Sequence, residues 1–235
     1  MIRSVIALVF AVVLASCASK PIVAVPKPTI KSIAIVPATN PLAYTIYNAN
    51  PALVMFFPIA SLGYSLDGRA KAKLFTEKVI ATKVTLGLEL TNAMAASLRE
   101  YGYSVQVLEN VKRAPNAPDD IDYDNIEHSA DALVHLSFSE VGLLSPRLST
   151  QYVPRLNASG VVFVRGHRDY LYDETIYYGA DAREGKRGTI VADAKFAYLD
   201  FDFVLNNLSS VLGAFSAGAR EVAKRMSEQI HEAVK

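Results

Sequence analysis

The residue best suited to covalent chemistry in this 235-residue chain is its one cysteine, Cys17. A lone cysteine has no partner in the chain for a disulfide, and it cannot form a cysteine-based metal site alone. It follows a basic start at Arg3 and an unbroken apolar run over Val5–Ala15. This order, with small residues at its end, is typical of a secretory signal peptide. The run is shorter than the roughly 20 apolar residues of a membrane-spanning helix.

The tetrapeptide that ends in this cysteine, Leu14-Ala15-Ser16-Cys17, resembles the lipobox of bacterial lipoproteins. The resemblance implies that residues 1–16 are a signal peptide, cleaved between Ser16 and Cys17. It also implies that the cysteine carries a diacylglycerol thioether and an N-acyl chain such as palmitate, which together anchor a protein stably. Ala18 follows the cysteine where an aspartate would prevent outer-membrane sorting in that family. The implied location is the periplasmic face of the outer membrane; the alternative is an ordinary signal peptide with an incidental cysteine.

An acidic stretch, "DDIDYDNIEHSAD" (119–131), is the strongest candidate for a metal site. Three aspartates occupy the first, third and fifth positions of an EF-hand-like loop, and a fourth occupies the twelfth. The sixth position is Asn125 rather than glycine, however, and no helix can enter through "APNAP". We therefore expect no metal, and we expect these aspartates to cap a short helix at "YDNIEHSA". The aspartates in question are Asp120, Asp122, Asp124 and Asp131.

The remaining candidates for catalysis are isolated. The four histidines, His128, His135, His167 and His231, have no second ligand at metal-binding spacing, and we expect surface or interface positions for them. "GYSLD" around Ser65 departs from the G-x-S-x-G nucleophile motif in its last residue. A hydrolase using Ser65 and His167, or a ligand-binding domain, is thus an alternative without a supporting motif. We expect no catalytic residue and no cofactor beyond the covalent lipid.

The segment "PALVMFFPIASLGYSL" (51–66) has no charged residue. Pro58 would break a helix at its centre, so a membrane span is not expected. Three interpretations of this segment are open. It is a buried irregular stretch, or two short helices, that covers the sheet; or it is an exposed contact for a partner, a sister subunit or the membrane. The third interpretation is a lid over a ligand pocket. Tyrosines at period two in a later strand offer a second contact. The predicted interaction surface comprises Leu53, Val54, Phe56, Phe57, Ile59, Leu62, Tyr170 and Tyr172.

Composition limits the class of protein. Loss of residues 1–16 removes one cation, Arg3, from the 24 Lys and Arg, leaving 23 against 23 Asp and Glu. A net charge near zero gives no sign of nucleic-acid binding, which favours a basic face. The mature length suits one hydrophobic core.

The elements that must position these residues follow from periodicity. Residues 17–30 contain three prolines and predict an extended tether. Residues 31–235 predict one α/β domain: a mixed sheet of about four to six strands, an amphipathic helix after the first strand, and a C-terminal helix packed on the sheet. An apolar insertion at about 38–73 interrupts it. The expected strands are 31–37, 103–109, 132–143, 160–164 and 170–179, and the expected helices are 86–101 and about 206 onward.

This order of elements, on a lipid tether, resembles envelope lipoproteins that share the fold of the Tol amino-terminal domain, among them the curli-secretion lipoprotein. The residues that carry this resemblance are the stretches "KSIAIVP", "LREYGYSV" and "ADALVHLSFSEVG". The resemblance implies an assembly or interaction factor that contacts unidentified envelope proteins. An alternative is a homo-oligomeric secretion or pore subunit that uses residues 51–66.

Overall fold

The computed structural model describes residues 29–49, 60–147, 149–165, 167, 169–183 and 185–235. The predicted signal peptide, Cys17, residues 18–28 of the tether and the contact residues Leu53–Ile59 lie outside the described residues. Leu62 lies within a helix, but its side chain is also outside the described part.

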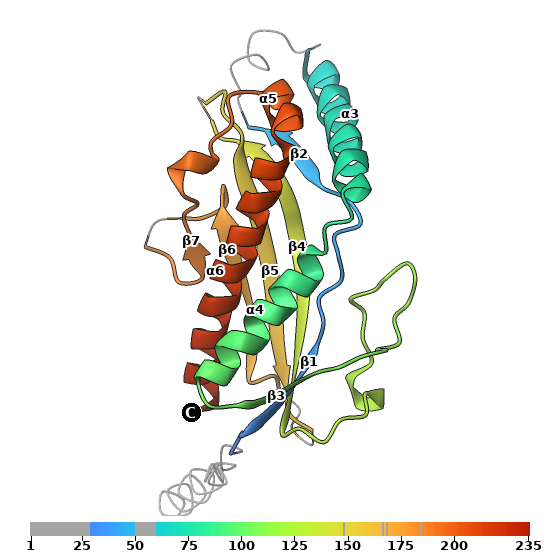
Figure 1. Cartoon of the computed structure of the whole chain (residues 1–235), viewed down its shortest axis with the longest axis vertical. Coiled ribbons are helices and arrows are strands. Elements are labelled where there is room, and N and C mark those ends of the chain that lie inside the picture. The colour runs from blue at the N-terminus through green and yellow to red at the C-terminus, as the bar shows by residue number, and fades with distance from the viewer. Residues whose placement is uncertain (1–28, 50–59, 148, 166, 168, 184) are drawn as a thin grey trace, which may run out of the picture.

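A single mixed sheet forms the centre of the domain (Figure 1). Its strand order is β3-β1-β4-β5-β6-β7, and β2 pairs with β4 beside β1. The pairs β4–β5 and β5–β6 are antiparallel, whereas β1, β2, β3 and β7 pair in parallel with their neighbours. The strands are β1 (Ser32–Val36), β2 (Thr45–Asn48), β3 (Ser104–Val107), β4 (Ala132–Ser145), β5 (Val153–Phe163), β6 (Tyr172–Gly179) and β7 (Thr189–Ile190).

Helices cover one face of this sheet. Figure 1 shows α4 and α6 crossing that face, with α3 and α5 near one end of the molecule. The apolar stripe of α4 is fully buried, and each large aliphatic side chain buried in this way stabilises the fold by about 1.5–3 kcal/mol. The helices are α3 (Ala60–Ala81), α4 (Leu86–Glu100), α5 (Phe201–Asn206) and α6 (Leu208–Val234).

The segment between β3 and β4 covers part of the opposite face. Ile121 packs with Val36 and Leu133 in a second, smaller apolar cluster. The short helix predicted for "YDNIEHSA" is wrong: only one 3₁₀ turn, Tyr123–Asn125, forms. Ile126 already has extended backbone, and Asp122 makes no capping bond, so nothing propagates the turn.

Strand β4 is long enough to separate two ends of the domain. Its first residues pair with β1, Ile33 opposite Ala132, and its last residues pair with β2, Asn48 opposite Ser145. At about 3.3 Å per residue, these two pairings lie about 40 Å apart along the strand. We call the end at which the described chain begins, beside the start of β4, the tether end. The other, where β2 ends and α3 begins, is the distal end (Figure 1).

The predicted fold class is confirmed: one α/β domain with helices, including a long C-terminal one, on a mixed sheet. The expected number of strands, about four to six, is lower than the seven in the sheet, because the short strands β2 and β7 carry no periodic signal. The region 38–73 contributes β2 to the sheet and the first half of α3. That helix begins at Ala60, just after Pro58, which favours a helix start and disfavours a helix interior.

We predict that Gly142→Ala will detach β2 from β4. A Cβ at this position would lie 1.9 Å from the Thr45 carbonyl oxygen, so one of the two strands must move. We expect a loss of about 1–3 kcal/mol in the free energy of unfolding, measured by chemical denaturation. Faster proteolysis near β2 should accompany it.

The matched control is Gly213→Ala on the exposed side of α6, where an added Cβ meets nothing within 4 Å. Alanine is the better helix former, so this variant should gain about 0.5–1 kcal/mol. Equal stability of the two variants would contradict the close approach of β2 and β4.

Candidate functional site

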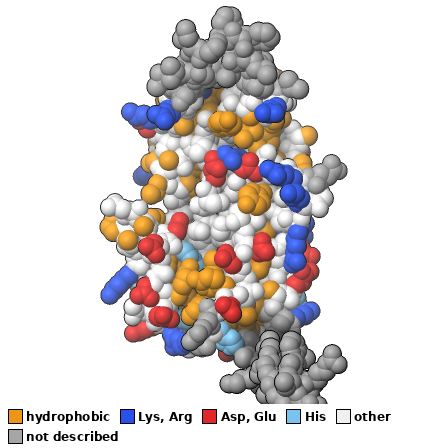
Figure 2. Space-filling model, turned by 180° about the vertical axis from the view of Figure 1, so that it is seen from behind, with side chains coloured by type: hydrophobic (Ala, Val, Ile, Leu, Met, Phe, Trp, Pro, Cys, Tyr) orange, Lys and Arg blue, Asp and Glu red, His pale blue; other side chains and the backbone are white. Residues whose placement is uncertain are grey.

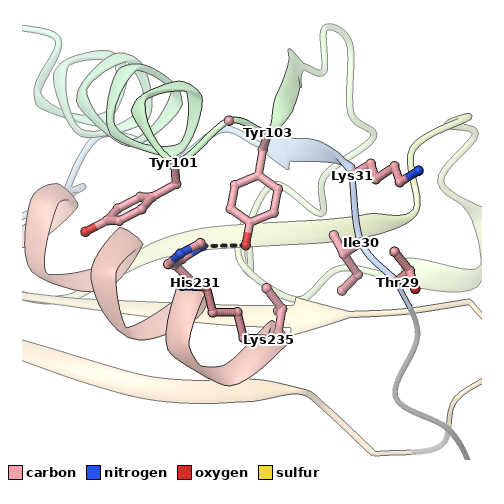
Figure 3. A pocket seen from close by; sticks show the side chains of 9 residues that line it. Thr29, Ile30, Lys31, Tyr101, Tyr103, His231 and Lys235 are labelled. Atoms are coloured by element: carbon pink, nitrogen blue, oxygen red, sulfur yellow. Dashed lines mark hydrogen bonds between the residues drawn. The ribbon is translucent and has the colours of Figure 1, made fainter.

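A surface pocket of about 500 Å³ lies at the tether end (Figure 3). Three separate parts of the chain form it: the start of the described chain before β1, the turn from α4 to β3, and the last turn of α6. The lining residues are Thr29, Ile30, Lys31, Tyr101, Gly102, Tyr103, His231, Val234 and Lys235.

Local backbone geometry presents two tyrosines to this pocket. Gly102 has a left-handed φ of 90°, which ends α4 and turns the chain into β3. Tyr101 and Tyr103, on either side of the glycine, both contact His231 (Figure 3). The Tyr101 ring stacks on the imidazole at 4.4 Å between centroids, and the Tyr103 hydroxyl is hydrogen-bonded to Nδ1 at 2.8 Å. The three side chains therefore form one fixed aromatic group.

The charge of this pocket is basic. Of the nine described residues that line it, Lys31 and Lys235 are cationic and none is acidic. Burial, and then the charge of Lys235, lower the pKa of His231, so its imidazole is neutral at pH 7. Burial raises the pKa of Tyr103, which therefore keeps its proton. The site offers hydrogen-bond donors and aromatic surface to an anionic group.

Sequence reasoning missed this pocket. The two tyrosines of the expected contact surface do not lie on one exposed surface. Tyr170 is 49% exposed, but it precedes β6 and packs edge-on against Tyr123. Tyr172 is buried, and its hydroxyl donates to Gln229 Oε1 at 2.9 Å. Tyr172 thus belongs to the core and contributes nothing to an exposed surface.

The distal end exposes apolar side chains from two elements. Tyr47 of β2 is 57% exposed, and Leu199 and Phe203, at the start of α5, are 59% and 42% exposed. A bridge between Tyr152 and Tyr198 holds the chain before α5 beside the start of β5. Tyr47 lies one residue before the end of β2, and the predicted contact segment follows β2 in the sequence.

The expectation for His135 is a surface or interface position. The structure buries it beneath the segment between β3 and β4, with 4% of its surface exposed. Its Nδ1 is hydrogen-bonded to the Tyr123 hydroxyl at 2.9 Å, and its buried Nε2 has no partner among the described residues. Burial lowers its pKa, although the nearby Asp119 partly opposes the effect and Arg113 adds to it. His135 is therefore neutral in the folded protein at pH 7.

On the face seen in Figure 2, acidic and basic side chains are interspersed with apolar ones. Arg155 of β5 pairs with Glu140 and with Asp181, and the Asn157 amide donates to Asp181 at 2.6 Å. The arginine is largely buried, so this network fixes the loop after β6 to the sheet. The network holds one cation and two carboxylates, so it carries a net charge of −1.

The other predicted candidates are dispersed. Asp131 Oδ2 accepts bonds from the backbone N–H groups of Lys31 and Ser32 and so anchors the start of β1. Within the described residues, no three His, Cys, Asp or Glu side chains gather at a spacing that could hold a metal ion. Ser65 lies inside α3, whereas His167 lies in the turn between β5 and β6, at the opposite end of the sheet.

Comparisons with known proteins assign no family. No protein-family model matches the chain, and no curated protein matches it. Three similar solved structures are bacterial proteins. Protein XCC0632 of Xanthomonas campestris has a TM-score of 0.42 and 6% identity, covering 89% of this chain and 91% of its own. CT253 of Chlamydia trachomatis has a TM-score of 0.38 and 12% identity, covering 86% of this chain and 98% of its own.

The third, lipoprotein GNA1162 of Neisseria meningitidis, has a TM-score of 0.31 and 14% identity, covering 77% of this chain and 97% of its own. At such low scores and identities these likenesses carry no argument about function, and the resemblance to the Tol and curli-secretion proteins stays a prediction. None of the helices in the described ranges has the length and apolarity needed to cross a bilayer.

We predict that His135 makes the fold acid-sensitive. Its folded pKa lies below its unfolded value of about 6.5, so the unfolded chain alone takes up the proton as the pH falls. The free energy of unfolding should therefore decrease from pH 7 to pH 5. His135→Phe should reduce this decrease by about 1 kcal/mol, measured by urea denaturation at both pH values.

His167→Gln, in the turn between β5 and β6, is the matched control and should keep the full acid dependence. The account of His135 fails if wild type and His135→Phe lose the same stability between the two pH values.

Proposed function

We propose that this protein is a lipoprotein of the outer membrane, anchored by acyl chains on Cys17. Its periplasmic domain binds other envelope proteins through its distal end and catalyses no reaction. The lipobox-like Leu14-Ala15-Ser16-Cys17 supports the anchor. The dispersed polar groups of the described residues support a role in binding rather than in catalysis.

One observation carries the proposal: the chain enters the domain at one end, whereas β2, which the uncharged segment 51–66 follows in the sequence, ends at the other. Residue 29 precedes β1, which pairs with the start of β4, whereas Tyr47 lies opposite Leu144 near the end of that strand. β2 ends and α3 begins at this same distal end, and the uncharged segment 51–66 follows β2 in the sequence and runs into α3. Tyr47, Leu199 and Phe203 add exposed apolar side chains at this end, and exposed apolar patches mark contact surfaces for partner proteins.

The packing of the distal end would make it a firm contact surface. The rings of Tyr44, Phe75 and Phe215 contact one another with centroids 5.8–6.4 Å apart and join the chain before β2, α3 and α6. The Lys71 ammonium group lies 5.7 Å from the centroid of the Phe201 ring, which links α3 to α5. These contacts hold the elements around segment 51–66 in one arrangement.

The mechanism would be tethering. Residues 18–28, extended at about 3.1 Å per residue, reach about 34 Å from the lipidated cysteine. Such a tether restricts the domain to a thin layer beside the membrane and raises its effective concentration for partners in that layer.

We predict that Cys17→Ala will release the protein from the membrane, because the variant lacks the sulfur that carries the diacylglycerol. Fractionation of cells should recover the variant in the soluble periplasmic fraction and wild type in the outer membrane. Full recovery of the variant in membranes would sink the anchor. Ser19→Ala, two residues away, is the control and should remain membrane-bound.

We also predict that the distal end contacts a partner in cells. Photo-crosslinking side chains placed at Tyr47 and at Phe203 should give adducts with a different envelope protein. The control position is Tyr177, which is 40% exposed on β6 and should give none. Adducts from Tyr177 but not from the distal positions would contradict the proposal. Adducts with the mass of two copies of this chain would instead favour the oligomeric secretion or pore subunit.

A further inference from the structure

We infer that the tether end of the domain rests on the headgroups of the membrane, with Lys31, Tyr101 and Lys235 at the contact. The distal end then faces away from the lipid. The inference rests on the proposed anchoring through Cys17 and adds to it the orientation of the domain and the residues that set it.

The point at which the chain enters the domain is the first support. Thr29, Ile30 and Lys31 themselves line the pocket, so the residues that lead to Cys17 begin at its rim. Twelve residue steps, about 37 Å of extended chain, separate Thr29 at this rim from the acylated cysteine. The pocket thus lies at the end of the domain that the tether connects to the lipid.

Charge complementarity is the second support. Lys31 and Lys235 are exposed, and the long apolar stems of lysines allow their ammonium groups to reach phosphate oxygens. Of the acidic side chains nearby, Asp131 accepts bonds from Ser32 and from two backbone N–H groups, and Glu232 pairs with Arg187 at 2.9 Å. Lys31 and Lys235 are the charged side chains with which the pocket lining itself would meet a lipid phosphate.

The aromatic group is the third support. Tyrosine is enriched at membrane interfaces because its ring is apolar and its hydroxyl is polar. Tyr101 is 40% exposed, and its stacking on His231 holds the ring in place at the rim (Figure 3). The hydrogen bond from the Tyr103 hydroxyl to Nδ1 holds the imidazole of His231 in place as well. A pre-formed aromatic surface loses little entropy when it meets the headgroups.

The absence of tryptophan from the chain permits a direct test. The full-length lipidated protein carrying Tyr101→Trp, or Tyr47→Trp as the distal control, is reconstituted in vesicles of phosphatidylethanolamine and phosphatidylglycerol with brominated acyl chains. Bromine quenches only nearby tryptophan. We expect the Tyr101→Trp emission to be largely lost and the Tyr47→Trp emission to be unchanged. Thr29→Trp, at an exposed position that also lines the pocket, is a second probe of the tether end, should the Tyr101 variant fold poorly.

The lysines are tested in the same vesicles. Lys31→Gln combined with Lys235→Gln, in the Tyr101→Trp background, should restore much of the emission. Lys73→Gln is the matched control, because this lysine of α3 is exposed and lies away from the pocket, and it should change nothing.

The outcomes separate the inference from the proposed function. Protein that does not float with the vesicles overturns the anchor and the inference together. Protein that floats while the Tyr101→Trp and Thr29→Trp emissions stay unquenched overturns the inference alone. Equal quenching of Tyr101→Trp and Tyr47→Trp shows a domain lying flat on the lipid and overturns it as well.

Discussion

The pairing of β1 and β2 with different parts of one edge of β4 is the constraint on which the account depends. Both strands run parallel to β4, β1 beside its first residues and β2 beside its last. Because a paired strand cannot change its length, the two pairings keep the ends of the domain about 40 Å apart. The tether end and the distal end therefore cannot act as one surface. The close approach of Gly142 to Thr45 shows how tightly β2 is held in place.

The helices make this strand pairing stable and at the same time assemble the pocket. The apolar sides of α4 and α6 meet on the sheet, where Met94 accepts a hydrogen bond from Ser227 across the helix contact. That packing brings the end of α4 to the end of α6, where Tyr103 meets His231. The same interactions that bury the core thus create the basic, aromatic rim at the tether end.

Sequence patterns predicted the elements in which apolar residues recur at a regular spacing and missed the elements too short to show one. The stripe of α4 and the alternation of β4 are long enough to show a period, so both were found within a few residues. β2 has four residues and β7 has two, too few for any period to emerge. The pocket was hidden because Tyr103 and His231 are 128 positions apart in the chain. His135 was misplaced because alternation within β4 cannot show that another segment covers its second face.

The orientation of the two ends relative to the membrane is the central claim, and energy transfer measures it most directly. Cys17 is the chain's one cysteine and its sulfur would be consumed by the lipid, so Tyr47→Cys or Thr29→Cys supplies a single free thiol for a donor dye. Acceptors are placed at the surface of the vesicle. The account predicts strong transfer from position 29 and weak transfer from position 47, consistent with a separation of about 40 Å along the sheet. Equal transfer from both positions would contradict it.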